Sequence, residues 1–251
     1  MHRFFLPAGS IASEKVNFPA PIAHQIRHVL RLKEGMEVEV LDNQGNALCV
    51  RLEAVEETNM VGQIVVRTKP QGEPAVQLTV CVSLTQREKF ELILQKTVEV
   101  GVTCIQPFVS RYSLVRDKSI EEKRRQRWED ILREAAEQSR RVLIPSLEEV
   151  YSLPKVIESC TAEYDLCLAA WEGEQTTSLQ NVLQSHQSDR KNLISIAIFI
   201  GPEGGFAQQE VELFQQAGVK PVSLGKRILR METAAIVAPA LILYELGEMG
   251  V

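Results

Sequence analysis

The segment FIGPEGGF, residues 199–206, follows an almost wholly apolar run over residues 193–200 and precedes a helical pattern. A run that is apolar on both sides is typical of a central strand in a parallel sheet covered by helices. Three glycines within this segment, Gly201, Gly204 and Gly205, let the backbone turn sharply and approach a ligand closely. Ligands of open α/β sheets bind beside the carboxyl ends of the strands. The segment is therefore the first candidate binding loop.

Strand-like and helix-like patterns alternate from Ala75 onward, which predicts an α/β domain with a largely parallel sheet over residues 75–251. Strands are expected over residues 76–84, 104–109, 164–170, 193–200 and 221–224, and helices over residues 89–100, 119 onward, 208–217 and 232–246. Residues 1–70 instead alternate with period two around a turn at residues 42–45, with one helix near Pro21. This pattern predicts a small β-rich N-terminal domain. The breaker-rich residues 70–74 separate it from the α/β domain.

Composition excludes several classes of protein. The 251 residues are 45% hydrophobic and 24% charged, and no stretch approaches the roughly 18 uninterrupted apolar residues of a membrane span. Five scattered cysteines, none in CxxC spacing, indicate a reducing compartment and buried thiols rather than metal ligands. We expect a cytoplasmic protein without membrane contact. The net charge of −5 argues against non-specific coating of nucleic acid, although residues 1–31 and 109–145 are locally basic.

A second loop follows the strand expected at residues 221–224 and carries the sequence SLGKRILRMETA, residues 223–234. Its apolar Ile228 and Leu229 lie among cations, a pattern that suits a loop folded over a flat aromatic group or an ordinary basic surface loop. Neither loop matches a dinucleotide fingerprint or a phosphate-binding P-loop. The acidic Glu203 would also repel a phosphate, so a ligand without phosphate is expected.

Together the two loops resemble the SPOUT superfamily of S-adenosylmethionine-dependent RNA methyltransferases. The segments MHRFF, HVLRLKEG, EKFELILQKTVEVGV and RWEDILREAAEQSRR extend the resemblance over essentially the whole chain. They resemble the branch that methylates N3 of a specific uridine in 16S ribosomal RNA of the small ribosomal subunit. The resemblance implies a C-terminal α/β trefoil-knot domain with an N-terminal PUA-like β-barrel. Methylation of a ribose 2′-oxygen, or a non-catalytic ribosome-assembly role, are the competing hypotheses.

The resemblance further implies that S-adenosyl-L-methionine lies bent in the knot, its adenine held by three loops. The implied cofactor-binding residues are Leu168, Ala170, Gly201, Glu203, Gly204, Gly205, Leu224, Gly225, Ile228, Leu229 and Arg230. A neutral adenine and a cationic sulfonium are compatible with Glu203 and with the missing phosphate cradle.

Methylation of uridine N3 requires a base for the N3 proton and a cation for the charge that spreads to O2 and O4. Arg230 is the candidate cation, and Glu232 and Glu203 are the candidate bases. The alternative interpretation of Glu232 is that it stabilises the start of the last helix, where negative charge is favourable. No metal is required by this chemistry.

Basic and imidazole side chains supply the candidate RNA contacts, namely Arg3, His24, Arg27, His28, Arg31, Arg140 and Arg141. His24 and His28 are spaced four apart like a metal pair, but no third ligand lies nearby in the sequence. Basic residues within the long helix alternate with acids and could pair inside the helix instead. The last helix is apolar on more than one side, which predicts a homodimer with the helix at the junction.

Overall fold

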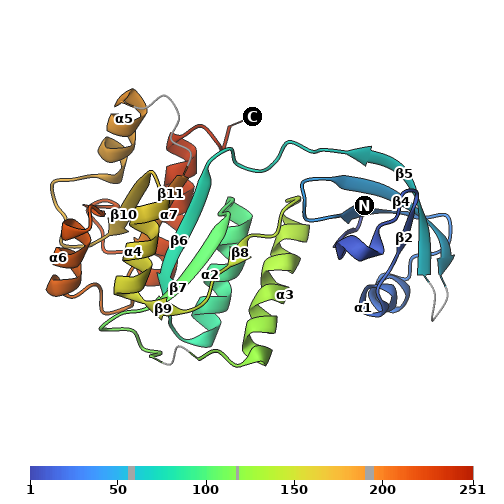
Figure 1. Ribbon diagram of the computed structural model, residues 1–251, viewed down its shortest axis with the longest axis horizontal. Helices are drawn as coiled ribbons and strands as arrows, with labels where there is room; N and C mark the ends of the chain where they lie inside the picture. The colour runs from blue at the N-terminus through green and yellow to red at the C-terminus, as the bar shows by residue number, and fades with distance from the viewer. Residues whose placement is uncertain (56–59, 117–118, 190–194, 251) are drawn as a thin grey trace. The chain divides into compact units, whose positions relative to one another are not determined.

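The computed structural model describes residues 1–55, 60–116, 119–189 and 195–250 (Figure 1). The chain forms two compact units. Unit 1 contains Met1–Glu73 and Ala136–Ile144, and unit 2 contains Pro74–Ala135 and Pro145–Val251. Residues 136–144 thus belong with the N-terminal unit, whereas the sequence pattern placed them in the C-terminal domain. The expected strand at residues 193–200 is described only from Ser195, because residues 193 and 194 lie outside the described part.

Unit 1 is built on a five-stranded sheet. Its order is β1 (Arg3–Phe5), β3 (Glu37–Leu41), β4 (Ala47–Val55), β5 (Met60–Thr68) and β2 (Lys15–Asn17); β1 is parallel to β3, and the other pairs are antiparallel. The β3–β4 turn is held by Asp42, whose Oδ1 accepts the backbone N–H groups of Gln44 and Asn46 at 2.8 and 3.1 Å. A short helix α1 (Ala20–His24) continues into a π-helical turn, Gln25–Val29, and buries Ile26 in the core of the unit.

Unit 2 contains a seven-stranded parallel sheet, which confirms the predicted α/β class. The strand order is β12 (Lys220–Val222), β10 (Leu166–Ala170), β11 (Ser195–Ile200), β6 (Gln77–Ser83), β7 (Cys104–Val109) and β8 (Ser146–Leu147), with β9 (Tyr151–Ser152) also paired to β7. All six residues of β11 are buried. The apolar run of the sequence is therefore the covered central strand that its pattern predicted.

Helices cover both faces of this sheet (Figure 1). On one face α4 (Leu153–Glu163) and α6 (Gln208–Gln216) share a core with Ala197 and Phe199 of β11. On the other, α7 (Met231–Glu245) packs against β11, β6, α2 (Arg87–Val100) and α5 (Leu179–Asp189). Neither α4 nor α5 is among the helices expected from the sequence. In α4 the proline stands in the first turn, where its missing N–H is harmless, so it opens the helix rather than breaking it.

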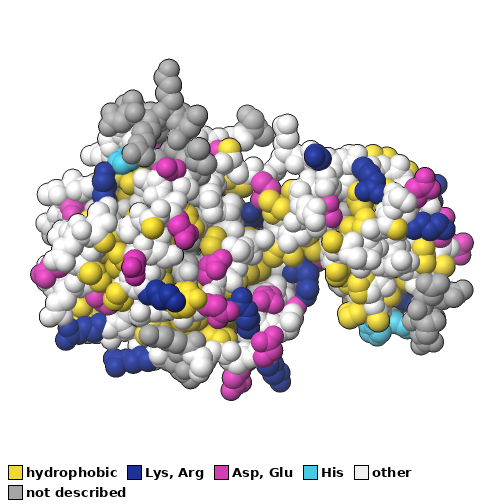
Figure 2. Space-filling model, in the orientation of Figure 1, with side chains coloured by type: hydrophobic (Ala, Val, Ile, Leu, Met, Phe, Trp, Pro, Cys, Tyr) yellow, Lys and Arg dark blue, Asp and Glu magenta, His cyan; other side chains and the backbone are white. Residues whose placement is uncertain are grey.

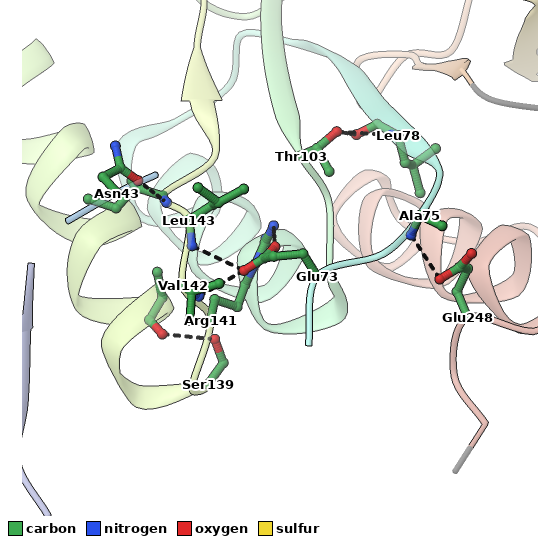
Figure 3. Close-up of polar contacts among 12 residues, drawn as sticks. Asn43, Glu73, Ala75, Leu78, Thr103, Ser139, Arg141, Val142, Leu143 and Glu248 are labelled. Atoms are coloured by element: carbon green, nitrogen blue, oxygen red, sulfur yellow. Dashed lines mark hydrogen bonds and ion pairs between the residues drawn. The ribbon is translucent and has the colours of Figure 1, made fainter. Parts of the chain in front are cut away.

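The long helix α3 (Glu122–Gln138) leads into the second segment of unit 1. There Glu73 joins the two segments (Figure 3). Its Oε2 accepts Arg141 Nε and Nη2 at 3.0 and 2.6 Å, and its Oε1 accepts the N–H groups of Val142 and Leu143 at 2.8 and 3.1 Å. The Arg141 side chain is only 5% exposed. The side chain is committed to this ion pair, which argues against the RNA contact expected of Arg141.

We expect Arg141→Met to lower the free energy of unfolding by about 3 kcal/mol, because it leaves the largely buried Glu73 carboxylate without its counter-ion. The matched control is Arg140→Met, since Arg140 is the exposed neighbour and its side chain faces solvent. Urea denaturation followed by circular dichroism measures both variants. Equal midpoints for the two would show that the pair contributes nothing to stability.

Candidate functional site

The three strands β12, β10 and β11 end level with one another. Ala170, the last residue of β10, is paired with Ile200 of β11 and with Val222 of β12. Because the strands are parallel, the loops that follow them leave the same edge of the sheet. The glycine-rich loop follows β11, and the cation-rich loop follows β12. The sequence placed these loops at strand ends, and the register brings them together.

A cavity of about 400 Å³ lies at this edge. Its wall comes from Ala170, from residues 200–203, 205 and 206, and from residues 228–232 and 234, with Lys89 of α2 and Glu172 completing it. A hollow of about 70 Å³ shares Ala170, Ile228 and Leu229 and extends to Leu224 and Gly225. Most of the expected cofactor-binding residues line one of the two.

Two expected residues do not line these cavities. Leu168 is fully buried inside β10, two residues before the strand ends. Gly204 is absent from the walls of both cavities, and a Cβ built on it would lie 3.2 Å from the Tyr112 Cβ. Gly205 is the glycine that the cavity requires: its φ is +71°, and an added Cβ would lie 2.5 Å from Glu172 Oε1. A side chain at position 205 would be strained and would push against the cavity wall.

Glu203 is held by two donors at the cavity wall. Thr85 Oγ1 donates to its Oε1 at 2.5 Å, and Lys89 Nζ donates to the same oxygen at 2.9 Å. Burial raises the pKa of Glu203, but these hydrogen bonds outweigh it, and the pKa is lowered from its ordinary value. The hydrogen bond in turn raises the pKa of Lys89. Both groups therefore remain charged at neutral pH.

Glu232 lies in the first turn of α7, whose N-cap is Arg230. Its Oε2 is buried and has no hydrogen-bond partner among the described residues. The position favours the helix electrostatically, yet that oxygen makes no cap with the backbone. Glu232 also lines the cavity, and a buried acceptor without a partner in the wall of a cavity requires an explanation, such as a ligand that the cavity holds.

The loop at residues 224–230 is largely open. Ile228 lines the cavity although its surface is 83% exposed, and Arg230 is exposed with no ion pair to the described residues. Sequence reasoning missed Thr85, Lys89 and Glu172. A signal for the first two was present, because they follow β6, another parallel strand of the same sheet, at its carboxyl end.

The candidate RNA contacts differ in their availability. His24 and His28 are exposed on unit 1 with ring centroids 4.7 Å apart, and Arg31 and Arg140 are exposed. Arg27 is half-buried, and its Nη1 is buried without a partner among the described residues. Arg3, by contrast, has a side chain only 10% exposed and pairs with Glu39, so it is unavailable for RNA.

Charges on the surface are mixed. On the face seen in Figure 2, basic and acidic side chains are interspersed rather than gathered into one patch. Within α3, Arg125 pairs with Glu129 and Arg133 with Asp130, which is the intrahelical pairing left open by the sequence. No described helix is long and apolar enough to span a membrane, and the described residues contain no cluster of metal-ligating side chains.

One side of α7 is buried within unit 2, including Ala235, Ala238 and Ile242. The other side carries Leu241 at 42% and Tyr244 at 71% exposure. Leu241 and Tyr244 both line a hollow of about 340 Å³ between α5 and α7. Ala238 is therefore a core residue of the chain, and only the exposed side of α7 is available to a second subunit.

The chain matches the family model described as an RNA methyltransferase domain over residues 72–243. It is 31% identical over 241 residues to a ribosomal RNA small subunit methyltransferase E of Bacillus subtilis, covering 95% of this chain and 91% of that protein. A protein of the same name from Synechocystis is 29% identical, covering 95% and 76%. These matches confirm the resemblance drawn from the two loops.

Solved structures are similar over nearly the whole chain. A ribosomal RNA small subunit methyltransferase E from Neisseria gonorrhoeae, bound to S-adenosylmethionine, superposes with a TM-score of 0.84 at 29% identity and 97% coverage of both chains. A methyltransferase from Legionella pneumophila, in complex with the same cofactor, gives 0.84 at 26% identity and 96% coverage of both chains. The chain therefore belongs to the RNA methyltransferase family whose members include the ribosomal RNA small subunit methyltransferases E.

Proposed function

We propose that this chain binds S-adenosyl-L-methionine in the cavity beside β10 and β11 and methylates N3 of a uridine in 16S ribosomal RNA of the small ribosomal subunit. The observation that carries the proposal is a cavity walled by the two loops and by Glu232, whose buried Oε2 has no hydrogen-bond partner among the described residues. The relatives solved with this cofactor support it. Its expected location is the cytoplasm, where the ribosomal substrate is assembled.

The cavity fits such a cofactor by its chemistry. Ala170, Ile200 and Leu229 offer apolar surface for a flat neutral base. Three carboxylates in the wall outnumber two cations, which favours a ligand with positive charge; the carboxylates are Glu172, Glu203 and Glu232, and the cations are Lys89 and Arg230. When bound, the cofactor supplies an electrophilic methyl group on a cationic sulfur.

Glu232 is the better candidate for the base. Glu203 is occupied by Thr85 and Lys89, and its lowered pKa makes it a weaker proton acceptor. Glu232 Oε2 has no such partner among the described residues, and the residue lines the cavity. Arg230, at the end of an open loop, remains the proposed cation for the charge that develops on the uracil oxygens.

RNA recognition is proposed for unit 1, as a PUA-like domain, and for the end of α3. The available side chains are His24, Arg27, His28, Arg31 and Arg140, whereas Arg3 and Arg141 are withdrawn because both are buried in ion pairs. The trefoil knot of unit 2 and a homodimer formed through the exposed side of α7 belong to the same proposal. No metal takes part in it.

Small ribosomal subunits from cells lacking the protein should gain N3-methyluridine when incubated with the purified chain and S-adenosylmethionine. Nucleoside mass spectrometry of digested 16S RNA measures the product, and Glu232→Gln should reduce its yield at least about ten-fold by removing the proposed base. A ribose-methylated product would instead support the 2′-oxygen alternative, and no methylation would support the assembly role.

Ala170→Leu should weaken S-adenosylmethionine binding at least about ten-fold, because the larger side chain fills the cavity at the end of β10. Titration calorimetry measures the dissociation constant, and thermal unfolding checks the fold. The control is Ala162→Leu, an exposed position on α4 in the same unit. Unchanged affinity in Ala170→Leu would place the cofactor elsewhere.

Light scattering at low micromolar concentration should give about twice the chain mass of 28.2 kDa. Leu241→Glu should shift the protein toward monomer, because it places a charge on the exposed apolar side of α7. Gln216→Glu, an exposed change on α6, serves as the control. A monomeric wild-type chain with full activity would refute the dimer.

A further inference from the structure

We propose that Lys89 is a second, preorganised cation of the active site, which stabilises the negative charge on a uracil oxygen, and that Glu203 and Thr85 are positioning residues that hold it there. This inference rests on the proposed function and adds to it. It changes the role of Glu203 from candidate base to support for a cation. Lys89 is not among the site residues expected from the sequence, although it follows β6 at the edge of the sheet where the cavity lies.

The position of Lys89 is set by two rigid elements. It lies in the first turn of α2, and α2 begins four residues after β6 ends. Its ammonium donates to Glu203 Oε1 at 2.9 Å while lining the cavity with Arg230 and Glu232. An ammonium has three donors, and only this one bond is made to the described residues. The remaining donors are available to a ligand in the cavity.

Thr85 stabilises the position of the Glu203 carboxylate. It is fully buried, and its hydroxyl donates to the same Glu203 oxygen at 2.5 Å. Glu203 is therefore held from two sides, and it fixes the Lys89 ammonium rather than leaving it on a free side chain. Fixed donors stabilise a developing charge without the reorganisation that a mobile side chain requires.

Arg230 lacks such support. It is exposed on an open loop, and it makes no ion pair with the described residues. The two cations face the same cavity from different elements, α2 and the loop before α7. We assign the preorganised charge to Lys89, whereas Arg230 offers a charge that no ion pair with the described residues holds in place.

The chemical step needs such a charge at the moment the proton leaves. The N3–H bond of uracil breaks, its proton goes to a carboxylate oxygen of Glu232, and the electron pair stays on the ring, spread over N3, O2 and O4. A cation close to O2 or O4 favours this anion and lowers the pKa of N3–H in the bound state. The N3 pair then forms the bond to the methyl carbon as the bond between that carbon and the sulfonium sulfur breaks, and the electron pair of the broken bond stays on the sulfur, which leaves as a neutral thioether.

The test compares Lys89→Met with Lys96→Met. Lys96 lies on the same helix with nearly the same side-chain exposure, 37% against 36%, and is paired with Glu99 instead of facing the cavity. Single-turnover methylation of small ribosomal subunits is measured from pH 6 to 10, together with KM for the subunits and calorimetric affinity for S-adenosylmethionine. Thr85→Val and Lys89→Arg complete the series.

We expect Lys89→Met to lower the single-turnover rate at pH 7 by about 100-fold, the usual effect of removing one such donor. The deficit should shrink as pH rises, because N3 then ionises without help. Cofactor affinity and KM should stay within about three-fold. Thr85→Val should show a smaller deficit of the same pH dependence, Lys89→Arg should recover part of the rate, and Lys96→Met should match the wild type.

Other results overturn the inference. A parallel loss of cofactor affinity would make Lys89 an anchor for the cofactor carboxylate, and a rise in KM alone would make it a phosphate contact. A deficit that is constant with pH would indicate a structural role. Mass spectrometry of the wild-type product keeps the proposed function separate: a wild-type chain that forms no N3-methyluridine refutes that function, whatever Lys89 does.

Discussion

The level ending of three adjacent parallel strands is the constraint on which the site depends. Ala170 is paired with Ile200 on one side and Val222 on the other, so the loops after β10, β11 and β12 begin from one row of the sheet. Shifting one strand along its neighbours would move its loop away from the cavity and turn its side chains toward different layers. The burial of all six β11 residues opposes such a shift.

A shared oxygen then organises the charges at that edge. One oxygen of Glu203 accepts hydrogen bonds from Thr85, in the loop after β6, and from Lys89 of α2. These bonds join the loop after β11 to the segment that follows the neighbouring strand. The lowered pKa of Glu203 and the raised pKa of Lys89 are two consequences of this contact. Glu232 takes no part in this hydrogen-bonded contact. Two acids of similar intrinsic strength therefore stand in different surroundings, and the different roles proposed for them rest on that difference.

Unit 1 shows the same reliance on one carboxylate. Glu73 accepts four hydrogen bonds from Arg141, Val142 and Leu143, which lie nearly seventy residues later in the chain. A segment with basic sequence, a natural candidate for binding RNA, thus completes the unit instead. The neighbouring Arg140 adopts φ +64° and stays exposed. Adjacent arginines of equal charge differ in availability because the backbone turns between them.

The sequence by itself determined the α/β class, the central strand and both binding loops, because strand and helix periodicity and glycine-rich turns are local properties of the chain. The two loops also carried the family resemblance. Which loop residues line the cavity depended on the tertiary structure. Gly205 packs beside Glu172 in the cavity wall, whereas its neighbour Gly204 packs beside Tyr112 outside that wall. Lys89 joins the site, and Arg3 and Arg141 leave the RNA contacts, through partners distant in sequence. Pairing of that kind is a property of the folded chain, and no local pattern encodes it.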